Sequence, residues 1–146
     1  MKKTFILIFA FSINLIYSKE IQVNLLELYK ELHANPELSY QEYETSKKLA
    51  SLLESIGYQV TRNVGGNGVV ALLENGDGNT VMFRADMDGL PVEEKTGASY
   101  ASKNRVKNLE GEEVFTMHAC GHDVHMTVLI GVAEYLYKIK DAWQGT

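Results

Sequence analysis

Nine consecutive residues, 117–125, hold the only cysteine and three of the four histidines of this chain. Thiolate and neutral imidazole are preferred ligands of zinc and its neighbours among the first-row transition metals. If the segment is extended, His118, Cys120 and His122 share one face, because side chains alternate along a strand. A lone cysteine is usually a small buried apolar residue, and an isolated histidine is usually satisfied by its neighbours. The clustering favours a metal, but the fold must bring further ligands from elsewhere.

The composition is that of one modest globular domain. Of the 146 residues, 45% are apolar and 23% are charged, which are ordinary proportions for a folded protein. The formal net charge of −5 is mild. The basic residues form no stripe interleaved with aromatic residues, so nucleic acid is not an expected partner.

Residues 1–18 differ in character from the rest of the chain. Lys2 and Lys3 lead into an apolar stretch that ends at Ser18 before polar sequence begins. This pattern predicts a secretory signal peptide cleaved after Ser18, and therefore a secreted or periplasmic protein without membrane attachment. The apolar run is short for a bilayer span of about 20 residues, so a retained anchor or a buried helix is the weaker alternative. An exported chain with one cysteine cannot form an internal disulfide, which adds weight to the metal interpretation.

Local patterns predict three helices. Apolar spacing over residues 20–33 indicates a helix that ends at Asn35-Pro36. The stretch 39–42 has the form of a capping box, which predicts a second helix that ends at Gly57. Asp123 is a candidate N-cap for a third helix, which extends to about residue 140. The expected core positions are Tyr43, Leu49, Leu52, Leu53 and Ile56 in the second helix, and Val124, Val128, Leu129, Val132, Leu136 and Tyr137 in the third.

Three β-like runs lie between the second and third helices, at 58–62, 68–73 and 80–84. Turns rich in Gly, Asn and Asp separate them, and the second and third runs are expected to be neighbouring hairpin strands of a core sheet. Neither turn has the Gly-Lys-Ser/Thr ending of a phosphate-binding loop. Residues 92–114 are polar and predict a long loop or a weak hairpin.

Two carboxylates, Asp86 and Asp88, directly follow the run at 80–84. If the backbone stays extended there, both side chains point the same way. Carboxylates in such places often orient metal-bound histidines by accepting the second ring proton. An aspartate-rich turn before Gly89 and Pro91 is the alternative on local evidence. The metal motif at 117–125 is what favours a functional role for the pair.

Three motifs in order carry a family resemblance: LHANPELS at 32–39, RADMDGLPV at 84–92 and MHACGHDVH at 117–125. In this order they resemble the opening of metal-dependent amidohydrolases of the group that contains hippurate hydrolases, N-acyl-amino-acid amidohydrolases and auxin-conjugate hydrolases. These enzymes are related to zinc aminoacylases and carboxypeptidases. The resemblance covers roughly residues 21–146. It implies an α/β, zinc-peptidase-like catalytic domain in which helices flank a central mixed sheet.

The resemblance also implies roles for individual residues. Cys120 and His122 match two ligands of a two-metal site, with manganese or zinc as the ions. Asp88 matches an active-site carboxylate that supports the metal centre, and Asp86 is its less certain companion.

Four further residues receive supporting roles. His33 belongs to the first motif, where packing or pocket support is expected rather than ligation. His118, Asp123 and His125 are expected to support the metal centre or line the substrate pocket.

The implied reaction is hydrolysis of the amide bond of small N-acyl amino acids, peptides or related conjugates, and a homo-oligomer is compatible with it. The family's general base and remaining ligands follow in a glutamate-containing segment and in later histidines that have no counterpart here. We therefore expect residues 19–146 to be the N-terminal part of a longer enzyme and to be inactive alone. A carboxypeptidase of the wider superfamily is one alternative. A non-catalytic secreted remnant with a weak metal-binding or interaction role is the other.

Overall fold

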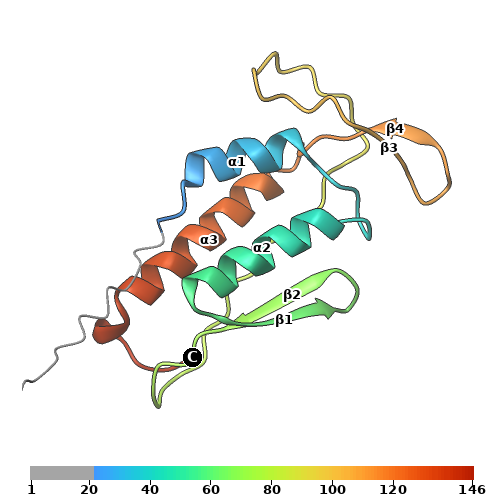
Figure 1. The fold of residues 1–146 in the computed structure, drawn as a ribbon. Coiled ribbons are helices and arrows are strands. Elements are labelled where there is room, and N and C mark those ends of the chain that lie inside the picture. Colours follow the sequence, from blue (N-terminus) through green and yellow to red (C-terminus); the bar gives the residue numbers. More distant parts are fainter. Residues whose placement is uncertain (1–21) are drawn as a thin grey trace, which may run out of the picture.

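The computed structural model describes residues 22–146 and contains both helices and strands (Figure 1). The predicted signal peptide at 1–18 lies outside the described residues. The elements in chain order are α1 (Leu25–Ala34), α2 (Tyr43–Ile56), β1 (Gln59–Val64), β2 (Gly68–Leu72), β3 (Arg105–Lys107), β4 (Glu113–Phe115), α3 (His122–Lys138) and a final 3₁₀ turn η1 (Lys140–Ala142). The predicted α/β class is confirmed, and within these residues the strands form two antiparallel pairs.

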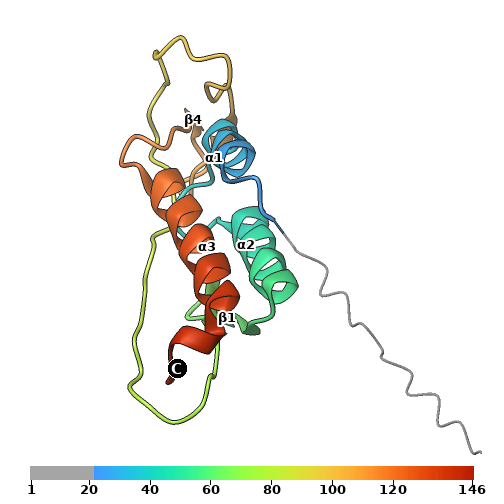
Figure 2. The same ribbon diagram turned by 90° about the vertical axis from the view of Figure 1, so that its left-hand side faces the viewer.

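The core lies among the three helices, and the β1–β2 hairpin packs against α2 (Figures 1 and 2). α3 contacts both α1 and α2, so it is the central helix of the group. Burial of large apolar side chains here is the main favourable contribution to folding. The buried core residues are Leu28, Leu32, Leu49, Leu53, Ile56, Met126, Ile130 and Ala133. No helix within residues 22–146 is long and apolar enough to cross a bilayer.

The first helix begins later than predicted. α1 starts at Leu25, because the side chain of Asn24 accepts the backbone N–H of Glu27 at 3.2 Å and caps the first turn. The predicted end is confirmed: Ala34 is the last helical residue, directly before Asn35 and the proline.

The capping box predicted at 39–42 does not form. Tyr40 has a φ of 66°, and the Ser39 hydroxyl instead donates to the Asp88 carboxylate. The N-terminus of α2 is capped from further back, where Glu37 accepts the backbone N–H groups of Glu44 at 3.1 Å and Thr45 at 2.8 Å. A carboxylate at this position also suits the positive end of the helix dipole. The predicted stop at Gly57 is confirmed by its φ of 118° in the left-handed region.

Replacing Glu37 by alanine is expected to lower the free energy of unfolding by about 0.5–2 kcal/mol, the usual loss for a removed helix cap. The matched control is Gln41→Ala, since the Gln41 side chain makes no hydrogen bond in the described structure, and its effect should stay within about 0.5 kcal/mol. Denaturant unfolding of both variants tests the assignment. Equal effects would show that Glu37 is not the cap.

The third predicted strand, at 80–84, does not form. The run at 68–72 pairs with β1 instead, because the short turn through Gly65 and Gly66 closes the β1–β2 hairpin. A β-strand forms only where a neighbouring strand accepts and donates its backbone hydrogen bonds. In the described part of the chain no strand lies alongside residues 82–84. Met82 and Phe83 are consequently 84% and 58% exposed. The expected pairing of the second and third runs was therefore wrong.

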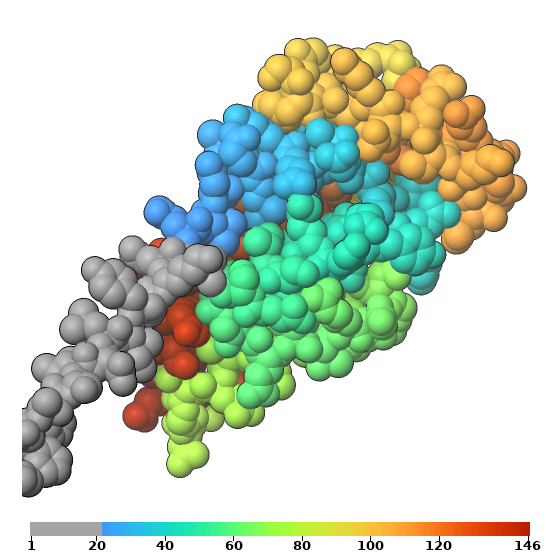
Figure 3. Space-filling model, viewed as in Figure 1, coloured from blue at the N-terminus to red at the C-terminus, as the bar shows by residue number. Residues whose placement is uncertain are grey.

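Residues 92–117 cross one end of the helices, where they cover the end of α1 (Figure 3). The weak hairpin predicted in this region is confirmed by β3 and β4, which pair through Arg105–Phe115, Val106–Val114 and Lys107–Glu113. Residues 92–104 form the loop part of the segment. This loop is anchored to the helices by side-chain contacts rather than by a sheet.

The third helix differs from its prediction in both start and buried face. Gly121, with a φ of 80°, precedes the first helical residue, so Asp123 lies inside the first turn rather than at the cap. Val124 and Val128 are 46% and 56% exposed, whereas Met126 and Ile130 are fully buried. Apolar residues occur on several sides of this helix, so tertiary contacts decide which face is buried. Tyr43 in α2 is likewise exposed, against expectation.

Candidate functional site

The segment 117–125 is a turn followed by a helix start, not an extended strand. His118 is 4% exposed, Cys120 is exposed, and Gly121 turns the backbone between them and α3. The expectation that His118, Cys120 and His122 share one strand face is therefore wrong, because the glycine breaks the alternation. Within residues 22–146, no group of three or more His, Cys, Asp or Glu side chains converges closely enough to hold a metal.

The His122 ring is held by Asp88, one of the two aspartates that follow the run at 80–84. Its Nδ1 lies 2.9 Å from the backbone oxygen of Asp88 and 2.9 Å from Oδ1 of the same residue. Both oxygens accept, so Nδ1 carries a proton, and in the neutral ring the lone pair is then on Nε2. This is the arrangement in which a carboxylate fixes the tautomer of a metal-binding imidazole.

Asp88 is itself fixed from two sides. Burial raises the pKa of its carboxyl, but hydrogen bonds from Ser39, from its own backbone and from His122 outweigh burial and lower the pKa. The carboxylate therefore stays ionised at neutral pH. Ser39 lies in the first motif and was not singled out from the sequence.

Asp86 lies on the other side of the His122 ring. Its Oδ2 is 3.9 Å from Nε2, while Arg84 donates to its other oxygen. Two metal bonds of about 2.1 Å can span at most about 4.2 Å, so Nε2 and this oxygen can reach the same ion. Cys120 adds an exposed thiol on the turn that precedes His122. The donor types, and the hydrogen bonds that hold Nδ1 of His122 and leave Nε2 toward Asp86, thus fit a divalent metal.

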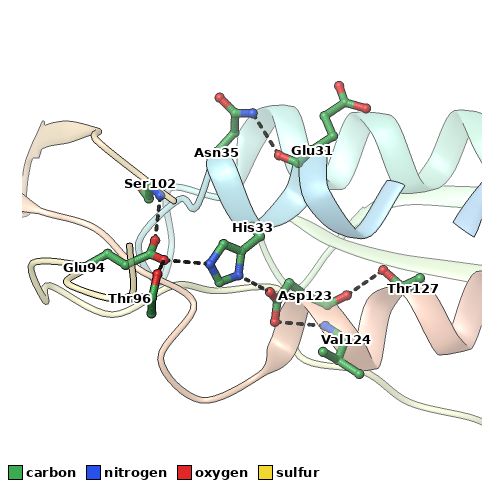
Figure 4. Close-up of polar contacts among 9 residues, drawn as sticks. All are labelled: Glu31, His33, Asn35, Glu94, Thr96, Ser102, Asp123, Val124 and Thr127. Carbon is green, nitrogen blue, oxygen red and sulfur yellow. Dashed lines mark hydrogen bonds and ion pairs between the residues drawn. The ribbon is translucent and has the colours of Figure 1, made fainter. Parts of the chain in front are cut away.

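A second cluster is built around His33, as Figure 4 shows. Its Nδ1 donates to Oδ2 of Asp123 at 2.7 Å and its Nε2 donates to Oε1 of Glu94 at 3.0 Å. The side chains of His33, Glu94 and Asp123 are 9%, 0% and 2% exposed. Since both partners accept, both ring nitrogens carry hydrogen and the ring is a buried imidazolium.

Contacts within this cluster shift the pKa values of His33 and Glu94 in opposite directions, so that both charged forms are favoured. Burial lowers the pKa of His33, but hydrogen bonds and charge interactions with Glu94 and Asp123 outweigh it and raise the pKa. Burial raises the pKa of Glu94, but hydrogen bonds from Thr96, His33 and the Ser102 backbone, with the charge of His33, lower it. The expected supporting role of His33 is consistent with these contacts.

The remaining predicted residues occupy two different environments. His118 is buried, and neither ring nitrogen has a hydrogen-bond partner in the described structure. Burial is the main reason that its pKa is lowered, so the ring is neutral. His125 is exposed, and its ring centroid is 5.9 Å from that of His122. A neutral histidine with free nitrogens beside Asp123 is chemically able to meet a ligand.

Sequence reasoning missed Glu94. It lies two residues beyond the second motif in a polar stretch without periodicity, and its partner His33 is 61 positions away. No local signal distinguishes it from the exposed Glu93, so only the fold identifies it.

Comparisons with known proteins relate this chain to a class of hydrolytic enzymes. Residues 82–146 match the description "Peptidase family M20/M25/M40". The predicted resemblance is confirmed: residues 82–146 match the model of this family, and the relatives that the chain resembles are named as hydrolases.

Three relatives illustrate the similarity. The chain is 44% identical over 129 residues to thermostable carboxypeptidase 2 of Saccharolobus solfataricus, covering 87% of this chain and 30% of the relative. It is 40% identical over 118 residues to hippurate hydrolase of Campylobacter jejuni, covering 80% and 28%. A crystal structure of a dinuclear metal-binding peptidase of the M20 family from Bacillus subtilis superposes with a TM-score of 0.68 at 37% identity, covering 80% and 30%. The chain thus spans about 30% of the length of these relatives.

Proposed function

We propose that these residues form part of a metal-dependent amidohydrolase that cleaves the amide bond of N-acyl amino acids or related conjugates. The observation that carries the proposal is the His122–Asp88 pair, two residues after the exposed Cys120, in which Nδ1 is held at 2.9 Å and Nε2 is left for a metal. The similarity to a hippurate hydrolase supports the substrate class.

Cys120 and His122 would each supply one ligand, and Asp86 is placed to contact the same ion as His122. Manganese and zinc both accept imidazole, and the thiolate favours zinc. When bound, such a metal activates water and polarises the amide carbonyl. Asp88 holds the ring of His122 in one orientation and one tautomer throughout. His118 and His125 lie in the same segment and are proposed to support the metal centre or the substrate pocket.

A carboxypeptidase activity is the second candidate, favoured by the 44% identity to a thermostable carboxypeptidase. Both reactions release an amino acid with a free carboxylate from an amide bond. The difference lies in the acyl side, which is a simple acid in one case and a peptide in the other.

The test is amine release by the natural full-length protein with added Mn²⁺ or Zn²⁺. Hippurate and other N-acyl amino acids are compared with C-terminally unblocked dipeptides and tripeptides. Faster turnover of the N-acyl amino acids supports the leading proposal, and faster turnover of the peptides supports the carboxypeptidase. No release from any substrate with either metal would contradict both and leave the non-catalytic alternative.

Export is the second part of this proposal, and it rests on the sequence pattern of residues 1–18 alone. Mass spectrometry of the N-terminal peptide from the secreted or periplasmic fraction tests it. A mature N-terminus at residue 19 is expected, whereas an intact N-terminus in the cytoplasmic fraction would overturn export.

Asp88→Asn is expected to weaken metal affinity about 10- to 100-fold, the usual cost of removing the partner that orients a metal-bound histidine. The asparagine can present its NH₂ group to Nδ1, which removes the fixed tautomer of His122. Titration of the metal-free protein with zinc and a competing chelator measures the change. Asp77→Asn, which alters an exposed aspartate outside the site, is the control. Equal metal affinities in Asp88→Asn and Asp77→Asn would show that Asp88 does not support the metal centre.

A further inference from the structure

We infer that Glu94 and His33 are positioning residues that hold the first turn of α3, and thereby His122, through Asp123. The inference rests on the proposed function, since His122 is the proposed ligand that they position. Glu94 lies in the loop 92–104, His33 in α1 and Asp123 in α3, so three separate segments meet at one buried imidazolium (Figure 4).

Asp123 connects the cluster to the proposed metal ligand. It directly follows His122, and its Oδ1 accepts the backbone N–H of Val124 at 2.9 Å while its Oδ2 binds His33. Its backbone oxygen accepts the hydroxyl of Thr127 at 2.7 Å. The side chain and the backbone of Asp123 are therefore both fixed, and the backbone of the preceding residue has little freedom to rotate.

His33 is fixed in turn by its surroundings. Besides its two carboxylate partners, the ring packs against Tyr29 and Tyr100, with centroid distances of 5.6 Å and 5.3 Å. The edge contact with Tyr100 comes from the same loop as Glu94. The ring is thus clamped in a single orientation between α1 and the loop.

Glu94 completes the arrangement from the loop side. Its Oε2 accepts the backbone N–H of Ser102 at 2.6 Å, and the Thr96 hydroxyl donates to Oε1. With its side chain fully buried, Glu94 has no water to replace these partners. A buried network in which every member is satisfied is rigid, whereas a partly satisfied one is costly. A substitution at Glu94 is therefore expected to shift the side chains of His33 and Asp123.

A role limited to general stability would leave the metal centre unchanged once the protein is folded. A positioning role predicts instead that the folded variant binds metal more weakly and with an altered coordination. The distinction requires a readout at the metal, separate from both stability and activity.

The experiment uses cobalt(II) as a probe in the metal-free, natural full-length protein. Cobalt affinity is measured by titration, and the thiolate-to-cobalt absorption band reports the Cys120 bond at saturating cobalt. Glu94→Gln keeps the shape of the side chain and removes its charge. Glu93→Gln is the matched control, because Glu93 is the exposed neighbour and, among residues 22–146, pairs with Lys95 alone, at 3.2 Å.

The expected result is a loss of cobalt affinity of roughly 2- to 30-fold in Glu94→Gln, with a shifted or weakened thiolate band, and no change in Glu93→Gln. If circular dichroism shows that Glu94→Gln is unfolded, Thr96→Val takes its place, since it removes one donor and leaves Glu94 charged. Wild-type affinity and an unchanged band in the folded variant would overturn the inference. Absence of the band in the wild type would instead overturn the proposed metal site, so the two failures are distinguishable.

Discussion

Replacing His33 by glutamine is expected to lower the free energy of unfolding by about 3 kcal/mol, at the low end of the cost of breaking a buried ion pair. The variant leaves Glu94 and Asp123 buried together without the positive charge between them. Glutamine has a similar length and can still donate to one carboxylate, which is why the lower end applies. Denaturant unfolding near pH 6 is the measurement.

The effect should depend on pH in a defined direction. The pKa of folded His33 is raised above its ordinary value of 6.5, so its contribution is fully present below pH 6.5 and is lost as the pH rises through the folded pKa. The pKa of folded Glu94 is lowered below its ordinary value of 4.5, so its contribution is present above pH 4.5 and is lost as the pH falls through the folded pKa. The loss of unfolding free energy in His33→Gln is therefore greatest between pH 4.5 and pH 6.5, and it becomes smaller as the pH rises through the folded pKa of His33.

Lys48→Gln is the control for this prediction. Lys48 pairs with Glu31 at 2.6 Å, but the pair is partly exposed, and such pairs contribute about 1 kcal/mol or less. A His33→Gln effect no larger than that of Lys48→Gln, or one that grows at high pH, would contradict the buried imidazolium.

Cys120→Ser is expected to lower metal affinity by more than about 100-fold, beyond the 10- to 100-fold effect of losing an indirect partner. Serine has similar size but supplies no thiolate, and the exposed thiol packs in no core, so stability of the metal-free protein should not change. Hydrolysis of the best substrate should fall in parallel. Metal titration and amine release on the same preparation measure both effects.

Ala119→Ser is the matched control, because it adds a hydroxyl at the exposed neighbouring position and leaves the thiol in place. It should bind metal and turn over substrate as the wild type does. Full metal affinity in Cys120→Ser would show that the thiol is not a ligand.

Features governed by local backbone chemistry could be predicted from the sequence. The end of α1 before Pro36 and the stop of α2 at Gly57 follow from proline sterics and from the positive φ that glycine tolerates. The motifs also predicted that Asp86 or Asp88 orients a metal-bound histidine, although not which one, and the structure shows Asp88 in contact with His122. Each of these depends on a few adjacent residues or on a motif.

Features that depend on contacts between residues far apart in the chain could not be predicted from the sequence. The run at 80–84 has strand composition, yet pairing is decided by which backbone lies alongside it. The cap of α2 comes from Glu37, which is seven and eight positions from the amides that it accepts. The buried face of α3 is set by contacts such as that of Asp123 with His33, 90 positions apart.

The most direct test of the account is X-ray absorption at the metal of the natural full-length protein loaded with zinc. The account predicts one sulfur ligand at about 2.3 Å and imidazole nitrogen at about 2.0–2.1 Å, with the sulfur lost in Cys120→Ser. A first shell of oxygen and nitrogen alone, identical in the wild type and Cys120→Ser, would contradict it.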